Sequence, residues 1–211
     1  MFRYTYKDYE KQGSRSMNWY VKLNKYFPVE EMKSKEHMER LLEEKADVYY
    51  KDESDLHVLM YAEFDTFIFI DYLWVSAKAR GKGIGHSLIK KLKEKSKPII
   101  LEVEPVDYED TDTAKRLHFY RREGFTHAQS IGYSRRSLAT DKDTQMEILY
   151  WSPNNESEDF IYEQIKQMYE DIHTYKDKEV YGQSYQHVDE VLTYDENREM
   201  NNIFDDLQVD K

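Results

Sequence analysis

The spacing of apolar residues predicts a helix followed by antiparallel strands in the first half of the chain. Residues 28–45 place a few apolar side chains among many charges, which is typical of a solvated amphipathic helix, here starting near Pro28. Apolar and other residues alternate with period two over 57–64, which indicates a strand. A short strand is expected before it at 46–50, and a longer, almost continuously apolar strand after it at 67–75.

The central part of the chain continues with two helices, each followed by strands. Ile84, Leu88, Ile89 and Leu92 form an apolar stripe that can pack on a sheet, and Pro98 ends that helix. The elements expected after it are a strand at 99–103, a helix at 113–123 that ends at Gly124, and strands at 128–135 and 145–151.

The last quarter of the chain differs in composition from the part before it. Apolar residues at helical spacing predict an amphipathic helix over 158–174, which we expect to pack against the preceding domain or against a second subunit. Residues 176–211 carry four basic and ten acidic residues, so a mobile acidic tail with at most one short ordered piece is expected. The predicted parts are an N-terminal extension (1–27), a compact domain (28–153), an amphipathic helix (154–175) and an acidic tail (176–211).

Composition and charge narrow the classes of function. Hydrophobic residues make up 39% of the 211 positions, enough for a folded core, and the net charge of −11 argues against nucleic acid or an anionic membrane as partner. The absence of cysteine excludes thiolate catalysis, and the scattered histidines predict no metal site. The apolar runs are too short to span a bilayer and no signal-peptide pattern is present, so cytoplasm is the expected compartment. Met1 and Met17 both remain candidates for the natural start.

Glycines concentrate between the strand at 67–75 and the helix that begins at Ile84. In the hexapeptide Arg80–Gly85, three glycines in five positions let backbone N–H groups close around an anion at a helix N-terminus. A Walker loop is excluded because Gly85 is followed by His86 rather than by lysine. A dinucleotide-binding turn is excluded because neither a further glycine at the required position nor a strand-helix-strand repeat follows. The loop therefore predicts a site for a phosphate-bearing cofactor.

Two motifs of the compact domain together resemble the GNAT superfamily of acyl-CoA-dependent N-acetyltransferases. The first is the glycine loop, in which Arg80, Gly83 and Gly85 match the family pattern. The second is Phe119-Tyr120, followed after three residues by Gly124-Phe125. The chain also looks like an uncharacterised subgroup of small proteins from low-GC Gram-positive bacteria. The resemblance implies an α+β fold of three layers, in which helices flank a mixed, largely antiparallel central sheet.

The resemblance implies that acetyl-CoA is the acyl donor, and it assigns residues to that donor. Backbone N–H groups from Gly81 to His86 would bind the pyrophosphate. The strand at Leu73 and Val75 would pair with the pantetheine arm, as a peptide pairs with an open strand edge. The implied cofactor-binding residues are Leu73, Val75, Arg80, Gly81, Lys82, Gly83, Ile84, Gly85 and His86.

The resemblance also implies which side chains move protons. Tyr120 matches the family's common general acid, whose phenol protonates the departing thiolate. Asp71 falls where many family members place a glutamate that deprotonates the amine, and Glu102 and Glu104 are rivals for that role. Asp71 is alternatively a group that binds the substrate amine.

Two functions are compatible with this sequence. The first is an acetyl-CoA-dependent N-acetyltransferase that moves the acetyl group directly, in a ternary complex, to a primary amine on a small molecule or a peptide. The second is an acyl-CoA-binding regulatory or interaction protein, because Ala114 and Arg116 depart from the family pattern and a long extension follows. A homodimer is left open. The acidic tail is expected to attract cationic amines, so that truncation after Tyr175 would leave coenzyme A affinity unchanged.

Overall fold

The structure is a computed structural model that describes residues 18–105, 111–137, 139–205 and 207. Within these residues, eight strands form one sheet in the order β1-β2-β3-β4-β7-β6-β8, and β5 pairs with β7 beside this path. The pair β3 and β4 is parallel, and the other pairs are antiparallel. The strands are β1 (Tyr49–Glu53), β2 (His57–Glu63), β3 (Ile68–Val75), β4 (Ile99–Val103), β5 (Thr126–His127), β6 (Ile131–Arg136), β7 (Asp143–Trp151) and β8 (Leu192–Tyr194).

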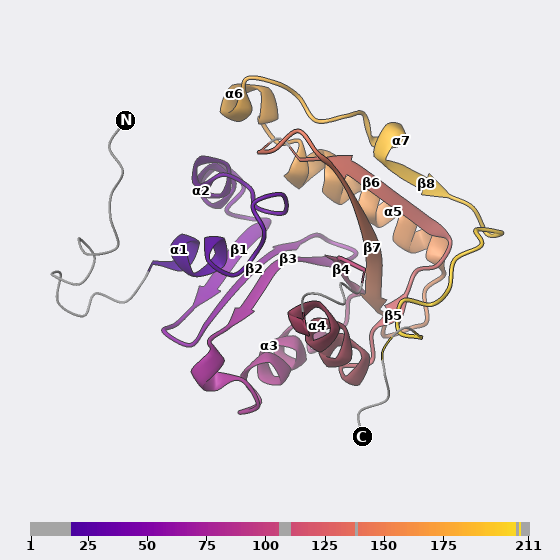
Figure 1. The fold of residues 1–211 in the computed structure, drawn as a ribbon, viewed down its shortest axis with the longest axis horizontal. Helices are drawn as coiled ribbons and strands as arrows, with labels where there is room; N and C mark the ends of the chain where they lie inside the picture. Colours follow the sequence, from indigo (N-terminus) through magenta and orange to yellow (C-terminus); the bar gives the residue numbers. More distant parts are fainter. Residues whose placement is uncertain (1–17, 106–110, 138, 206, 208–211) are drawn as a thin grey trace, which may run out of the picture.

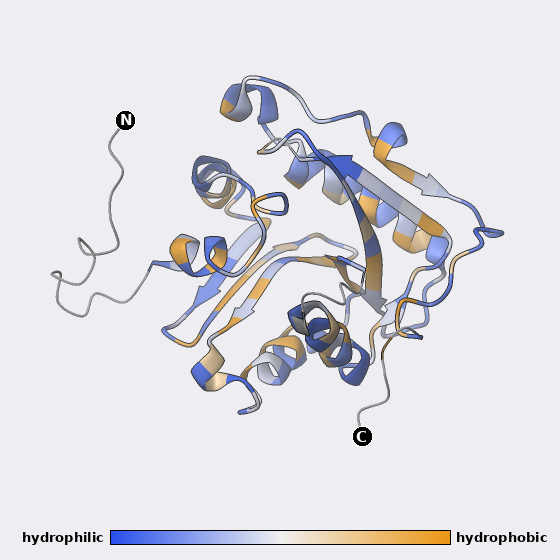
Figure 2. Cartoon of the chain, viewed as in Figure 1, coloured by the Kyte–Doolittle hydropathy of each residue, from blue (hydrophilic) through white to orange (hydrophobic). Residues whose placement is uncertain are grey.

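Helices cover both faces of this sheet, which confirms the predicted mixed, three-layer α+β fold (Figure 1). The helices are α1 (Trp19–Asn24), α2 (Lys35–Glu44), α3 (Ile84–Lys93), α4 (Thr111–Arg122), α5 (Glu158–Met168), α6 (Asp177–Tyr181) and α7 (Val188–Val191). Apolar residues of α3 and α4 form one core with the sheet, whereas those of α1, α2 and α5 form a second core on the opposite face. The predicted packing of the amphipathic helix against the domain is therefore observed, and Figure 2 shows apolar residues recurring along α5.

Pairing between β3 and β4 stops part-way along both strands. Only Ile68, Phe69 and Ile70 of β3 pair with β4 in the described residues, so the two strands separate beyond this point. The pairing of β3 with β2 continues to Val75, but with a shift of register between Ile70 and Tyr72 that leaves Asp71 as an extra residue. Such a bulge bends the strand and turns two successive side chains to the same face. The separation and the bulge together open one edge of β3.

The N-terminal part differs from the single helix predicted over 28–45. Asn18 and Ser34 each accept a backbone N–H with their side chains and so begin two separate helices, α1 and α2. A turn over 28–32 lies between them, held by the backbone hydrogen bond from Glu31 to Pro28 (3.1 Å). The strand β1 begins at Tyr49 rather than at residue 46, because residues 46–48 form a turn after α2.

The prediction of a mobile tail over residues 176–211 is wrong for most of the described residues in this range. The segment contains α6, α7 and β8, and β8 pairs with β6 from Leu192 to Tyr194. Farther on, Ile203, Phe204 and Leu207 are buried in the core beneath α3 and α4. Buried apolar area and strand pairing stabilise the segment in spite of its acidic composition.

The described residues contain no helix that is both long and apolar enough to cross a membrane.

Candidate active site

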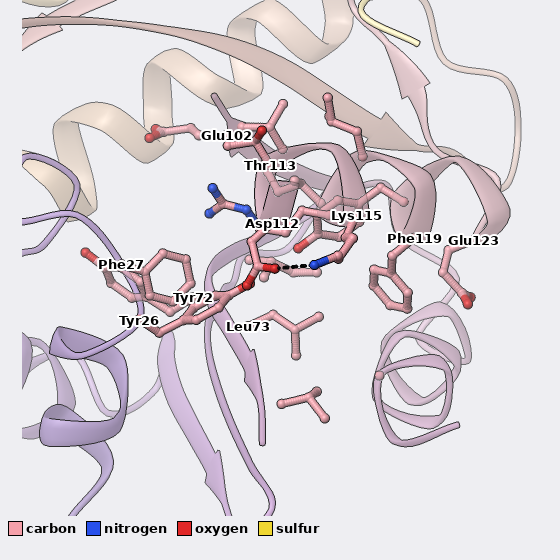
Figure 3. Close-up of a pocket in the computed structure, with 18 of the residues that line it drawn as sticks. Tyr26, Phe27, Tyr72, Leu73, Glu102, Asp112, Thr113, Lys115, Phe119 and Glu123 are labelled. Atoms are coloured by element: carbon pink, nitrogen blue, oxygen red, sulfur yellow. Dashed lines mark hydrogen bonds and ion pairs between the residues drawn. The ribbon is translucent and has the colours of Figure 1, made fainter. Parts of the chain in front are cut away.

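A cavity of about 500 Å³ lies where β3 and β4 separate, between these strands, the loop after β3 and helix α4. Figure 3 shows Leu73 beside this space, with Tyr26, Phe27 and Tyr72 grouped at one side and Phe119 of α4 and Glu123, just after α4, at the other. Cationic groups of Arg80, Lys115, Arg116 and Arg122 contribute to its lining, as do carboxyl groups of Glu31, Asp71, Glu102 and Glu104.

The glycine loop forms one wall of the cavity and leads directly into α3. Gly81 and Gly83 have φ angles of +76° and +80°, a left-handed conformation that side chains disfavour. A Cβ atom at either position would meet nothing within 4 Å, so the space in front of the loop is open. Gly83 is the N-cap of α3, whose first N–H groups therefore face an open region at the positive end of the helix dipole.

Gly85 is required for a different reason. A Cβ atom there would lie 3.1 Å from the Phe119 ring, so the glycine lets α3 approach α4 closely. His86 adds a second link between these helices, because its Nδ1 lies 3.1 Å from Glu123 Oε1. On the other side of the loop, Arg80 forms an ion pair of 3.2 Å with Asp112 at the start of α4. The loop is thus fixed against α4 at both ends.

The open part of β3 brings the remaining predicted cofactor residues to the cavity. Leu73 and Val75 line it, together with Arg80, Gly81, Gly83, Ile84, Gly85 and His86. Lys82 does not line it, and its backbone N–H donates to the Ala79 carbonyl oxygen at 3.2 Å. The structure therefore brings eight of the nine predicted cofactor-binding residues into one cavity, and leaves Lys82 outside it.

Tyr120 enters the cavity from α4 and is 8% exposed. It packs edge-on against Phe119 and Phe125, the neighbours that complete the second sequence motif. Burial raises the pKa of the Tyr120 phenol well above its ordinary value, although the nearby Arg116 acts to lower it. The phenol is therefore protonated at neutral pH and available as a hydrogen-bond donor.

Asp71 also lines the cavity, but its carboxylate is engaged by other residues. Its Oδ1 lies 2.7 Å from Lys33 Nζ, and its Oδ2 accepts a hydrogen bond of 2.5 Å from Tyr49. The side chains of Lys33 and Asp71 are 5% and 4% exposed, so this is a buried ion pair. Burial lowers the pKa of Lys33, and Asp71 acts to raise it. Both carboxylate oxygens of Asp71 thus have partners, which leaves it poorly suited to accept a proton from a substrate.

Glu102, a rival to Asp71, belongs to a second buried network. Its Oε1 lies 2.6 Å from His173 Nε2, and its Oε2 lies 3.9 Å from Arg135 Nε. Although burial acts to raise it, His173 and Arg135 bring the pKa of Glu102 down to about 2. Burial lowers the pKa of His173, with Lys33 acting in the same direction. The pair therefore joins an ionised carboxylate to a histidine that resists protonation.

Glu104, the other rival, lies beside Glu31 at the side of the cavity formed by the loop before α2. Arg116 connects them: its NH2 group is 3.3 Å from Glu104 Oε2, and its NH1 group is 4.0 Å from Glu31 Oε2. Burial, followed by the neighbouring carboxyl of Glu104, raises the pKa of Glu31 to about 8. This carboxyl is unusual in holding its proton near neutral pH.

Sequence reasoning does not identify two groups of this cavity. Glu31 lies in a charged segment whose pattern predicts a helix, so nothing separates it from its neighbours. His173 lies in a π-helical turn, Tyr169–His173, that follows α5 and buries its ring beside Glu102. No local motif marks either residue, since each is brought to the cavity by tertiary packing.

Comparisons with known proteins point to a family of acetyltransferases. A family model described as the acetyltransferase (GNAT) domain matches residues 44–127. A protein of Bacillus subtilis (strain 168), YjbC, which bears the provisional name of an acetyltransferase, is 64% identical over 191 residues, covering 90% of this chain and 100% of that protein. A solved structure from Bacteroides thetaiotaomicron, provisionally assigned as an acetyltransferase of the GNAT family, has a TM-score of 0.57 and 24% identity over 78% of this chain and 90% of that one. The structural likeness concerns the fold.

Proposed function

Because the chain belongs to the GNAT family of acetyltransferases, we propose that it moves an acetyl group from acetyl-CoA directly to a primary amine, with both substrates bound together. The single observation that carries this proposal is the cavity where β3 and β4 separate, which joins the glycine loop, the open edge of β3 and the Tyr120 phenol. The absence of cysteine agrees with direct transfer, because no thiol can hold the acetyl group between two half-reactions.

The donor's diphosphate is proposed to bind in front of the glycine loop. Open space beside Gly81 and Gly83 leaves room for it, and the first N–H groups of α3 would donate to its oxygens. The pantetheine arm would then follow the unpaired edge of β3, where the backbone at Leu73 and Val75 has no strand partner on the β4 side among the described residues. This course ends beside Tyr120.

Tyr120 is proposed to assist departure of the thiolate. The amine nitrogen forms a bond to the thioester carbonyl carbon as the carbon–sulfur bond breaks. The phenol donates its proton to the sulfur and recovers one from the nitrogen, so that amide and free thiol result. A phenol with a raised pKa remains protonated before the reaction, as this role requires.

The acceptor is proposed to enter from the side of the cavity formed by the loop before α2. Tyr26, Phe27 and Glu31 of this segment line it. Aromatic rings beside carboxyl groups suit an amine carried on a small molecule or on the end of a peptide. Asp71 is proposed to shape this end through its ion pair with Lys33 rather than by direct proton transfer.

The test is release of free thiol from acetyl-CoA in the presence of polyamines, aminoglycosides, amino acids and short peptides with free N-termini. We expect release that depends on the amine, with an acetylated acceptor detected by mass spectrometry. Coenzyme A that binds in calorimetry without thiol release for any of these amines would overturn the proposal and favour an acyl-CoA-binding protein.

A further inference from the structure

Glu31 is held in the cavity wall with one oxygen unsatisfied. Its side chain is 9% exposed, and its Oε1 atom has no hydrogen-bond partner among the described residues. The other carboxylates of the cavity interior have donors: Asp71 binds Lys33 and Tyr49, and Glu102 binds His173. A buried carboxyl oxygen without a donor is costly, because it has lost water without gaining a replacement. A bound ligand with an N–H group would supply the missing partner.

The segment that carries Glu31 is fixed rather than loose. The Tyr72 hydroxyl donates to the Glu31 carbonyl oxygen at 2.8 Å and accepts the Lys33 backbone N–H at 2.9 Å. Tyr72 follows the bulge at Asp71, which turns both side chains toward this segment. The unpaired oxygen is therefore presented by a positioned backbone and not by a chance conformation of a surface loop.

The surroundings of Glu31 are suited to a cation. The Arg116 guanidinium lies between Glu31 and Glu104, with its Cζ atom 5.9 Å and 5.8 Å from the ring centres of Tyr26 and Phe27. Two carboxyls and two aromatic faces thus already hold one positive group. Arg116 leaves Glu31 Oε1 without a donor, so an ammonium group that reached this oxygen would supply one.

We propose that Glu31 binds the ammonium group of the acceptor through its unpaired oxygen and takes the proton that the amine must lose before attack. The proposal rests on the acetyl transfer described above and assigns a residue to its acceptor. Arg116 lies one helical turn before Tyr120 on α4, so the group that takes the amine proton and the group that protonates sulfur flank the same guanidinium.

Glu31 and Tyr120 together account for both protons that the amine loses. The ammonium gives one proton to the Glu31 carboxylate and becomes a neutral amine, whose nitrogen then attacks the thioester. The second proton of the nitrogen reaches the sulfur through Tyr120, and Glu31 releases its proton to water after the product leaves. The products are one amide, one thiol and one proton.

The charged groups around Glu31 set the pH at which it can act. Burial, followed by Glu104 just after β4, raises its pKa, whereas Arg116 on α4 and Arg135 on β6 lower it, and together they give it a value of about 8. A proton acceptor must be ionised, so kcat/KM for a primary alkylamine should rise with pH through about 8. The amine itself ionises near pH 10, about two units higher, and does not obscure this step.

The experiment compares Glu31→Gln with Glu30→Gln in the full chain. Glu30 is the adjacent residue, but its carboxyl pairs with Lys142 at 3.4 Å and does not line the cavity. Glu31→Gln should lower kcat/KM by about 100-fold or more and remove its rise near pH 8, with coenzyme A affinity unchanged. Glu30→Gln should behave as the wild type.

A second variant keeps the test decisive if Glu31→Gln folds poorly. Glu104→Gln removes the neighbouring negative charge, so the rise of kcat/KM should move to lower pH. An unchanged pH profile in Glu104→Gln would overturn the assignment of Glu31, and so would near wild-type kcat/KM in folded Glu31→Gln. In either case, amine-dependent turnover by the wild type would still support acetyl transfer. Wild-type protein that acetylates no amine would overturn both.

Discussion

Burial and hydrogen-bond partners determine which carboxyl groups around the cavity can accept a proton. Asp71, Glu102 and Glu104 are all candidates for the proton acceptor on sequence grounds. In the structure, Lys33 and Tyr49 bind both oxygens of Asp71, His173 binds Oε1 of Glu102, and Arg116 binds Oε2 of Glu104. Glu31, whose Oε1 is buried without a hydrogen-bond partner, is not among the three. For single residues, hydrogen-bond partners therefore decide which carboxyl can accept the proton of the amine.

The substitution Asp71→Asn tests whether Asp71 is mainly structural. It leaves the Lys33 ammonium buried without its counter-charge, so the free energy of unfolding should fall by about 3–5 kcal/mol in urea titrations. Asp141→Asn is the control, because Asp141 forms an exposed pair with Arg136 that should contribute less than about 1 kcal/mol. Undiminished stability together with lost turnover would instead support Asp71 as the proton acceptor.

At the scale of elements, the loop between β3 and α3 places backbone groups rather than side chains at the cavity. Gly83→Ala should strain the left-handed backbone by about 1–2 kcal/mol and put a methyl group into the open space before the loop. Coenzyme A affinity, measured by calorimetry, should then fall by about tenfold or more.

Gly182→Ala provides a matched control for that substitution. Gly182 ends α6 with φ of +75°, and a Cβ atom there would also meet nothing within 4 Å, but this glycine lies outside the cavity lining. Both variants should lose similar stability in thermal unfolding, and only Gly83→Ala should lose coenzyme A affinity. Equal affinities in the two variants would mean that the loop does not contact the donor.

The sequence predicts the elements with strong periodicity and the loop with its special backbone. The strand at 99–103 has the expected bounds, and Gly124 follows α4 with φ of +76°. The separation of β3 from β4 and the bulge at Asp71 have no such local signal, because strand register depends on pairing with distant residues. Glu31 and His173 escape sequence reasoning for the same reason, since burial creates their roles.

At the scale of the whole molecule, the C-terminal segment packs against the domain instead of extending from it as a mobile tail. Arg198 donates to both oxygens of the buried Glu147, at 3.1 and 3.3 Å, and to the carbonyl oxygens of Gln129 and Ile131. His127 completes this cluster, with Nε2 2.9 Å from Glu147 and Nδ1 accepting the Ile203 N–H at 3.2 Å. These contacts tie the segment to β5, β6 and β7, so truncation after Tyr175 should destabilise the domain.

Arg198→Ala tests whether these contacts hold the C-terminal segment in place, without truncating the protein. The buried Glu147 carboxylate would lose its guanidinium partner, so the free energy of unfolding should fall by about 3 kcal/mol. Arg136→Ala serves as the control because its partner Asp141 is exposed, and its loss should stay near 0.5 kcal/mol, about the value of a surface pair. Equal unfolding curves for the two variants would contradict the packing of the C-terminal segment on the domain and would support the mobile tail predicted from the sequence.

The central claim is that the cavity beside Tyr120 performs acetyl transfer, and Tyr120→Phe tests it most directly. The measurement is kcat for thiol release with an accepted amine, alongside coenzyme A affinity, with Tyr61→Phe on β2 as the control. We expect kcat to fall by about 100-fold or more in Tyr120→Phe alone, with affinity unchanged, because only the proton donor is lost. Full turnover in folded Tyr120→Phe would contradict the account.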